Sequence, residues 1–415
     1  MRKVAALFPA VAASAILAAG ALVLTAGTGH AATTKTTAAL GNNWYASAPY
    51  YDTLDSSAPD LGQVMAATGQ KAFELAFVLA PNGGGCTPTW DGTDPVATDT
   101  QVAAVINEVR SDGGDVSVSA GGYGGTKLGQ ECGTPAATAA AYQQVITTYG
   151  LHAIDFDLEE PEIESASSIN NELGAAQILQ KEDPGLYVSV TIPSTTTGAN
   201  YFGGLLLDNA KSLGFTPNNY SIMPFDGGFN GAASQITALQ DFNAQLSSTF
   251  GWSSSTAYAH EGFSGMNGRT DTSEYFYQTD FQTVLNFAEA NGLGRYTFWS
   301  LNRDRECNPP NNNGSLSSEC SSVTQNAYDF TKYTTQFAGA TPPTSPPTTA
   351  PASPTASPTS GGGSGGTCAA AWSASAAYTS GQEVSYNGDN WTANQWNDDE
   401  VPGGSSGAWT SDGAC

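Results

Sequence analysis

Three carboxylic acids stand at alternate positions in the segment YGLHAIDFDLEEPEIE, residues 149–164. They are Asp155, Asp157 and Glu159. Like charges a few ångströms apart raise one another's pKa values, so at least one acid should keep its proton near neutral pH. Glu159, the outermost, would then be an acid that protonates a leaving oxygen, with the charge of Asp157 behind it, which is the chemistry of glycosidic bond hydrolysis.

The spacing of these acids predicts a β-strand that presents them on one face. Side chains alternate along a strand, so Ile154, Phe156 and Leu158 would occupy the opposite face. In a (β/α)8 barrel the apolar face would pack on the helices. The acids would then point inward and toward the C-terminal mouth, where barrel enzymes carry out their chemistry.

Two other structures could explain the acidic segment. A water-facing edge strand would also tolerate the acids, but the segment is the fourth of the predicted strands and lies between helices. A calcium loop of the EF-hand type needs Gly at its sixth position, and the sixth residue from Asp155 is Glu160. The sequence therefore favours a catalytic site.

Short β-rich segments alternate with amphipathic segments over about 300 residues before the Pro-rich stretch at residues 341–366. The clearest helix is predicted over 98–114, where Val102, Val105, Ile106 and Val109 form one stripe. The last helix is predicted over 322–337. The predicted strands are residues 44–51, 73–80, 115–122, 153–160, 186–193, 220–227, 256–263 and 296–304. This order predicts the α/β class and a (β/α)8 TIM barrel.

The chain divides into four predicted parts. Residues 1–31 begin with two cations, continue as an apolar run and end in small residues, which is typical of a secretory signal peptide. Residues 32–340 would form the catalytic barrel, residues 341–366 a Pro/Thr/Ser/Gly linker, and residues 367–415 a small disulfide-closed β module. No later apolar run is long enough to span a membrane, so we expect an extracellular, secreted protein with no membrane partner.

Charge and cysteine content narrow the function further. The formal net charge is −25, which leaves few cations to neutralise phosphates, so nucleic acid is a poor partner. His152 and His260 have no metal-binding spacing, and we expect no metal, no cofactor and a monomer. Six cysteines in an exported chain suggest disulfides, and proximity along the chain pairs Cys86 with Cys132, Cys307 with Cys320, and Cys368 with Cys415.

The barrel segment resembles glycoside hydrolase family 18, the chitinases, over residues 42–338. The segment IDFDLE resembles the family's DxxDxDxE motif, and SAGG, IMPFDGG and FWSLNRD resemble three further strand motifs in the same order. Family 18 enzymes are substrate-assisted. The resemblance implies that Glu159 is the general acid and base, that Asp157 orients the substrate's acetamido group, and that Asp155 holds Asp157.

The same resemblance implies a set of substrate-binding residues. Ser119 would hydrogen-bond behind the acids, Asp226 would contact the acetamido group, and Trp299 would form the floor of the sugar site. Met223 belongs to the same motif as Asp226. The residues implied for substrate binding are therefore Ser119, Met223, Asp226 and Trp299.

Two positions depart from the family pattern. His152 stands where many members have the first Asp of DxxDxDxE, and Phe225 stands where many have a Tyr beside the Asp of the MxYD motif. The chain between Phe263 and Tyr296 is too short for the extra lobe that walls the cleft in some chitinases. An open groove is therefore expected, and it favours endo-cleavage of long chains.

The C-terminal segment resembles the chitin-binding modules of carbohydrate-binding families 5 and 12. Flat aromatic rings dock on sugar rings, and Trp372 and Trp396 are predicted to be exposed platforms. Gln395 replaces the first Trp of a common Trp-Trp pair. The matching residues are Trp372, Tyr378, Gly381, Val384, Tyr386, Gly388, Trp391, Trp396, Pro402, Gly403 and Trp409.

Together these features predict a secreted endochitinase with a retaining, substrate-assisted mechanism, acting on chitin or another polysaccharide of N-acetylglucosamine. Two alternatives stay open at the level of sequence. An endo-β-N-acetylglucosaminidase acting on N-glycans would share the barrel, and the chitin-type module argues against it. A non-catalytic chitin-binding protein is the other alternative, and the presence of Glu159 argues against that.

Overall fold

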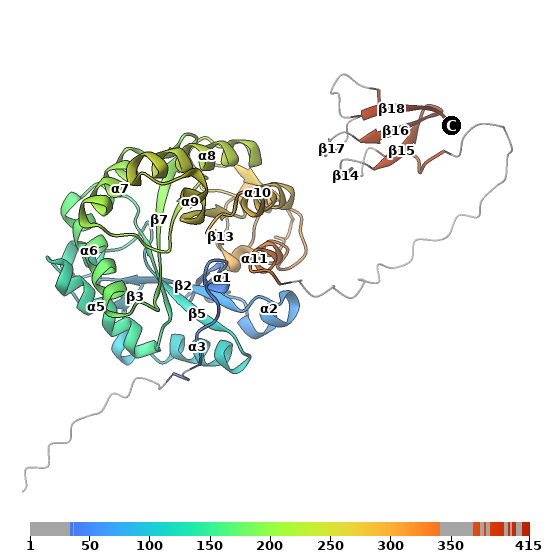
Figure 1. Ribbon diagram of the computed structural model, residues 1–415. Helices are drawn as coiled ribbons and strands as arrows, with labels where there is room; N and C mark the ends of the chain where they lie inside the picture. The colour runs from blue at the N-terminus through green and yellow to red at the C-terminus, as the bar shows by residue number, and fades with distance from the viewer. Residues whose placement is uncertain are drawn as a thin grey trace, which may run out of the picture. The chain divides into compact units, whose positions relative to one another are not determined.

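The computed structural model describes two compact units, which divide between Ser345 and Pro346 (Figure 1). The predicted signal peptide and linker lie outside the described residues, so their boundaries stay predictions. The residues that the structure describes are 34–35, 37–340, 368–373, 377–378, 382–393, 397–398, 401–403 and 409–415.

The first unit is built around a curled parallel sheet. Its parallel strands, in order around the sheet, are β1 (Tyr50–Asp52), β2 (Ala72–Leu79), β5 (Asp115–Gly121), β6 (Ala153–Asp157), β7 (Tyr187–Thr195), β9 (Asn219–Met223), β10 (Glu261–Met266) and β13 (Arg295–Trp299). Between β13 and the segment before β1, the Tyr296 N–H donates to the carbonyl oxygen of Ala46 at 2.9 Å. This hydrogen bond joins the two ends of the sheet into a ring.

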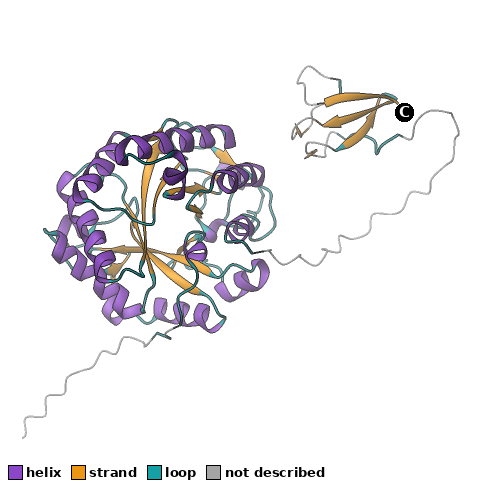
Figure 2. Ribbon diagram, viewed as in Figure 1, coloured by secondary structure: helices purple, strands orange, loops and turns teal. Residues whose placement is uncertain are grey.

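Helices surround this sheet, as Figures 1 and 2 show. Each parallel strand is followed along the chain by a helix that packs outside the ring. The helices are α2 (Leu61–Thr68), α3 (Gln101–Ser111), α5 (Pro135–Tyr149), α6 (Ala166–Glu182), α7 (Tyr201–Leu213), α8 (Gly231–Phe250), α10 (Gln278–Asn291) and α11 (Thr331–Phe337). The predicted barrel fold is therefore confirmed.

The ends of these helices follow from local sequence. In α5 the Thr134 side chain accepts a hydrogen bond from the Ala137 N–H, and Pro135 occupies the first helical position, where a missing N–H costs nothing. The helix ends at Gly150, whose φ of 59° is in the left-handed region that Gly adopts without strain. The strand β6 that carries the acids begins soon afterward, at Ala153.

Several sequence predictions of secondary structure were wrong at their ends. The strands predicted to end at residues 160, 227 and 304 end at Asp157, Met223 and Trp299. Residues 44–49 do not extend β1, because α1 (Asn42–Tyr45) and a turn precede it. Residues 256–259 belong to α9 (Ser254–Ala259), because Ser253 caps this helix through the Thr256 N–H. The last helix begins at Thr331 and not at residue 322, because the Asp304 carboxylate accepts hydrogen bonds from the N–H groups at its start.

The two faces of β6 have different surroundings, as its pattern predicts. Ile154, Phe156 and Leu158 are buried in the main apolar core, and the Phe156 ring meets the Tyr142 ring of α5 edge-on at 5.1 Å. Asp155 faces the inside of the barrel, where it is fully buried among polar side chains. Asp155 and Asp157 therefore share the inner face of β6, and Glu159 lies just beyond the end of the strand.

The second unit is a small β module. Its core contains Tyr378, Val384, Ala393 and Trp409, and its described strands are β14 (Ala377–Tyr378), β15 (Glu383–Tyr386), β16 (Asp389–Ala393), β17 (Asn397–Asp398) and β18 (Trp409–Ala414). Disulfides join Cys368 to Cys415 in this unit, and Cys86 to Cys132 and Cys307 to Cys320 in the barrel. These are the pairs expected from proximity along the chain. Among the described helices, none is both long and apolar enough to cross a membrane.

Candidate active site

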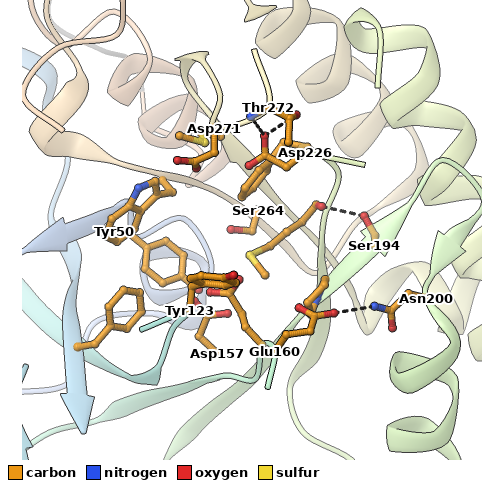
Figure 3. Close-up of a pocket in the computed structure, with 17 residues that line it drawn as sticks. Tyr50, Tyr123, Asp157, Glu160, Ser194, Asn200, Asp226, Ser264, Asp271 and Thr272 are labelled. Carbon is orange, nitrogen blue, oxygen red and sulfur yellow. Dashed lines mark hydrogen bonds between the residues drawn. The ribbon is translucent and has the colours of Figure 1, made fainter. Parts of the chain in front are cut away.

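A pocket of about 630 Å³ opens at the C-terminal ends of the barrel strands. Asp157, the last residue of β6, and Glu159 just beyond it both line this pocket. Its volume lies within the range of small-molecule sites. The lining residues are Tyr50, Phe77, Tyr123, Asp157, Glu159, Glu160, Pro193, Ser194, Asn200, Met223, Phe225, Asp226, Ser264, Met266, Asp271, Thr272 and Trp299 (Figure 3).

Asp155 lies below the pocket and is held by hydroxyl groups from the strands β1, β5 and β7. Tyr50 and Ser119 donate to its Oδ2, each at 2.9 Å. Ser189 and Thr191 donate to its Oδ1, at 2.5 and 3.0 Å. Four hydroxyl donors therefore serve the two oxygens of this buried carboxyl group. Ser119 therefore lies behind the acids, as the family resemblance implied, and touches Asp155.

Asp157 is buried, but one of its oxygens lacks a partner. Among the described residues nothing donates a hydrogen bond to its Oδ1, and the bonds of Asp155 go elsewhere. That Asp155 holds Asp157 stays a prediction. Burial, followed by the charges of Glu159 and Asp155, raises the pKa of Asp157 well above its usual range, while Lys127 and Arg295 oppose the shift.

Glu159 has the titration behaviour that an acid catalyst needs. Burial raises its pKa to about 7, and the carboxyl groups of Glu160, Asp271 and Asp226 act in the same direction. The positive charge of Lys127 opposes them. A carboxyl group with this pKa is protonated in much of the protein at neutral pH and can both give and take a proton.

We predict that activity on an uncharged substrate falls as the pH rises through about 7, because Glu159 loses the proton that it must donate. Above that pH, kcat/KM should drop about tenfold per pH unit. Measuring kcat/KM from pH 4 to pH 10 tests this. A rate that stays constant up to pH 9 would contradict the assignment of Glu159 as the acid.

The opposite side of the pocket is also acidic (Figure 3). Asp226 lines it, and its Oδ1 accepts hydrogen bonds from the Thr272 N–H and hydroxyl, both at 2.8 Å. Glu274 fixes the backbone here, because its carboxylate accepts from the N–H groups of Asp226, Gly228 and Phe229, each at 2.7 Å. Burial and the neighbouring Asp226 raise the pKa of Asp271, which lines the same side.

Aromatic rings form an apolar wall between the two acidic sides. Trp299 stacks on Phe77 with ring centres 5.4 Å apart and meets the Tyr50 ring edge-on at 6.0 Å. Met223 completes this surface, and its carbonyl oxygen accepts from the Ser194 hydroxyl at 2.8 Å. A flat aromatic ring beside carboxyl groups is suited to a pyranose ring, which has apolar faces and a polar edge.

The comparisons with known proteins agree with this geometry. Residues 371–410 match the family model for carbohydrate-binding module family 5/12. Over 275 residues the chain is 27% identical to a probable bifunctional chitinase/lysozyme of Escherichia coli (strain K12), covering 62% of this chain. The chain spans only 30% of the length of that relative.

Solved structures extend the comparison to the barrel. The catalytic domain of a hyperthermophilic chitinase from Pyrococcus furiosus is 27% identical, with a TM-score of 0.63 over 70% of this chain and 93% of that domain. Catalytic site mutants of active domain 2 of a thermostable chitinase from that organism, complexed with chito-oligosaccharides, are 26% identical with a TM-score of 0.62, over 70% and 93% of the two chains. The predicted resemblance to chitinases is confirmed.

The chitinase-like barrel brings together most of the residues predicted for the site. Asp157, Glu159, Met223, Asp226 and Trp299 all line the pocket, and Ser119 and Asp155 lie directly beneath it. Phe225, which stands where many family members have a Tyr, also lines the pocket. The pocket therefore has a phenyl ring at this position and no hydroxyl group.

His152 is separate from this pocket. It precedes β6, at the opposite end of the strand, and its Nδ1 lies 2.9 Å from Asp115 Oδ2. Asp115 also accepts from Arg110 Nε at 2.8 Å and from the Tyr45 hydroxyl at 2.7 Å. The departure from the family motif at residue 152 therefore falls in a structural cluster away from the acids.

Several pocket residues were missed by sequence reasoning. Tyr50 lay in a predicted strand but resembled an ordinary core aromatic. Tyr123 lies between glycines in the sequence, and an aromatic residue in a Gly-rich loop could have suggested a binding role. In the structure its side chain is 74% exposed. Asp271 lies in a turn between two short strands, β11 (Gly268–Arg269) and β12 (Tyr275–Phe276), where no periodicity marks it.

One aromatic prediction for the binding module needs correction. Trp372 is only partly exposed: it packs against the module core and meets the Tyr386 ring edge-on at 5.2 Å. Because the core of this module is small, the Trp372 ring packs against it and is not the fully exposed sugar-binding surface that was expected. Trp396 and Gln395 lie outside the described residues.

Proposed function

We propose that the protein is a secreted chitinase that hydrolyses β-1,4-linked polymers of N-acetylglucosamine. The observation that carries this proposal is Glu159, a carboxylic acid with a pKa of about 7 at the mouth of a chitinase-like barrel, directly beside the buried Asp157. The match of residues 371–410 to a carbohydrate-binding family supports a polysaccharide substrate. The chitinase names of the relatives support chitin as that polysaccharide.

The mechanism that we propose uses the substrate's own acetamido group. Glu159 gives its proton to the leaving glycosidic oxygen while the acetamido oxygen forms a bond to the anomeric carbon. The result is an oxazolinium ion and a free leaving sugar. Glu159, now ionised, takes a proton from water while the water oxygen attacks the anomeric carbon. The bond between that carbon and the acetamido oxygen breaks, which opens the oxazolinium ring and restores the acetamido group.

Asp157 has the right acceptor for this mechanism. Its Oδ1 lacks a partner, and an acetamido N–H would supply the missing donor. This hydrogen bond and the positive charge of the oxazolinium ion both favour ionised Asp157, in opposition to the burial that favours its neutral form. Asp157 would therefore stabilise charge that develops only during the reaction.

Cleavage inside long chains is part of the proposal. Between β10 and β13 the structure holds only short β11 and β12 and the helix α10, with no added lobe in these described residues. An unwalled pocket can accept a chain that continues past both ends. The C-terminal module would hold the enzyme near its insoluble substrate and raise the local concentration of chain segments.

The proposal is tested by hydrolysing chitin oligomers and identifying the anomer of the first product by NMR. Attack by the acetamido oxygen followed by water gives two inversions, so the β-anomer should form first. Oligomers that lack the acetyl group at the cleavage point should react at least about 100-fold more slowly, because they have no internal nucleophile. An α-anomer, or equal rates on both substrates, would contradict the mechanism.

A further inference from the structure

Lys127 is a buried cation close to the proposed catalytic acids. It directly precedes the short helix α4 (Leu128–Glu131), and only 1% of its surface is exposed. Its Nζ donates to the carbonyl oxygens of Gly121, at 3.1 Å, Gly122 and Gly124. An ammonium group has three N–H donors and no acceptor, whereas a neutral amine has only two donors. Three carbonyl acceptors therefore match the charged form.

The loop that Lys127 holds packs directly on the end of β6. The Gly122 N–H donates to the carbonyl oxygen of Asp157 at 2.8 Å. A Cβ at Gly121 would lie 2.0 Å from that same oxygen, and a Cβ at Gly122 would lie 2.8 Å from the Phe77 ring. Both glycines have positive φ, so no other residue fits this close approach. The loop also brings Tyr123 to the pocket (Figure 3).

Charged groups surround Lys127 on several elements. Burial lowers its pKa, and the carboxyl groups of Glu162, Asp157, Glu159 and Glu172 oppose this shift. Glu162 follows β6 in the chain, and Glu172 lies on α6. The influence is mutual, because Lys127 lowers the pKa of both Asp157 and Glu159.

Other charges that act on the two acids come from the barrel and its mouth. Arg295, at the start of β13, also lowers the pKa of Asp157, and Asp155 raises it. Glu160, Asp271 and Asp226 raise the pKa of Glu159. Lys127 is thus the cation that acts on both acids from the side of the glycine loop.

We propose that Lys127 is a positioning residue for the reaction proposed above. Its ammonium group fixes the Gly121–Gly124 loop against the end of β6 and supplies the positive charge that favours ionised Asp157 and Glu159. Glu159 must be ionised to accept a proton from water in the second step, and Asp157 must be ionised to stabilise the oxazolinium ion. This inference rests on the proposed function.

The test compares Lys127→Met, which removes the charge, with Lys127→Gln, which removes the charge but keeps two N–H donors. Both variants should shift the alkaline limb of the kcat/KM profile upward by about one pH unit, because the acids lose a nearby positive charge. In both, kcat should also fall about tenfold. If Lys127→Met does not fold, Lys127→Gln still gives the comparison.

The direction of the shift separates this role from a purely structural one. If the loop merely moved and let water reach Glu159, the pKa would fall toward its ordinary value and the limb would shift downward. A matched control is Val284→Ala, which removes core volume on α10. It should lower Tm and leave the limb in place. An unchanged or downward-shifted limb in the Lys127 variants would overturn the proposal.

A second readout does not depend on catalysis. The Glu159 carboxyl resonance can be followed by NMR in protein labelled with ¹³C at glutamate, and it is identified by its absence in Glu159→Gln. Its titration midpoint should rise by about one pH unit in Lys127→Gln. If the wild-type protein fails to cleave chitin oligomers but this midpoint rises, the proposed function fails and the electrostatic role of Lys127 stands. An unchanged midpoint overturns that role.

Discussion

Replacing Glu159 by Gln should reduce the hydrolysis of chitin oligomers by about 10³- to 10⁴-fold. The amide has nearly the shape of the carboxyl group, but it has no proton that it can give to the leaving oxygen. It also cannot accept a proton from water in the second step. Both halves of the proposed reaction therefore lose the same group, while the pocket around it stays in place.

The measurement is kcat/KM on chitin oligomers, together with Tm and binding to insoluble chitin. Binding and Tm should stay close to those of the wild type, because Glu159 is near the surface of the pocket and the binding module is a separate unit. The matched control is Glu164→Gln, an exposed carboxyl on the same connection after β6, which should keep full activity. Turnover by Glu159→Gln at the wild-type rate would rule out the acid assignment.

Much of the fold could be predicted because each strand carries its own local pattern. The alternation in β6 indicated one inner polar face and one outer apolar face, and Asp155 and Phe156 lie on those faces. The errors fall where local sequence supports two structures. Residues 256–259 have strand-forming Tyr and Thr, but the cap at Ser253 makes them helical.

The part of the site carried by strand ends was also predictable, since a motif places its residues at fixed positions in the barrel. The residues that support the acids from below could not be predicted, because they are far apart in the sequence and come together only in the folded barrel. Arg295 and Glu74 are 221 residues apart in the chain and form an ion pair inside the barrel. A lysine in a sequence is normally expected at the surface. Lys127 is buried instead, and this could not be predicted because its carbonyl partners lie together only in the folded loop.

The interior of this barrel is polar where it supports the acids. Arg295 donates to Thr191 Oγ1 at 2.9 Å and to Ser221 Oγ at 3.2 Å, and it pairs with Glu74. Its Nη1 also lies 3.6 Å from Asp155 Oδ1. The cation thus compensates two buried acids, Glu74 on β2 and Asp155 on β6. Loss of Arg295 should therefore affect both the stability of the fold and the charge beneath the pocket.

Replacing Arg295 by Met should destabilise the protein by about 3–5 kcal/mol at pH 9, because the buried Glu74 and Asp155 lose their shared cation. Burial raises the pKa of Glu74 to about 8, and Arg295 opposes this shift. Without Arg295 the pKa of Glu74 must rise further. A carboxyl group whose pKa is higher in the folded state stabilises the fold while protonated and loses that contribution as the pH rises. The deficit of the variant should therefore be smaller at pH 5 than at pH 9.

Urea unfolding of wild type and Arg295→Met at pH 5 and pH 9 gives both free energies of unfolding. The matched control is Lys332→Met, which removes the cation of a partly exposed pair with Asp329 at 2.8 Å. Because water already screens that pair, its loss should cost less than about 1 kcal/mol. If the two variants lose equal stability, or if the deficit of Arg295→Met is the same at both pH values, the buried carboxyl groups do not depend on Arg295 for their charge.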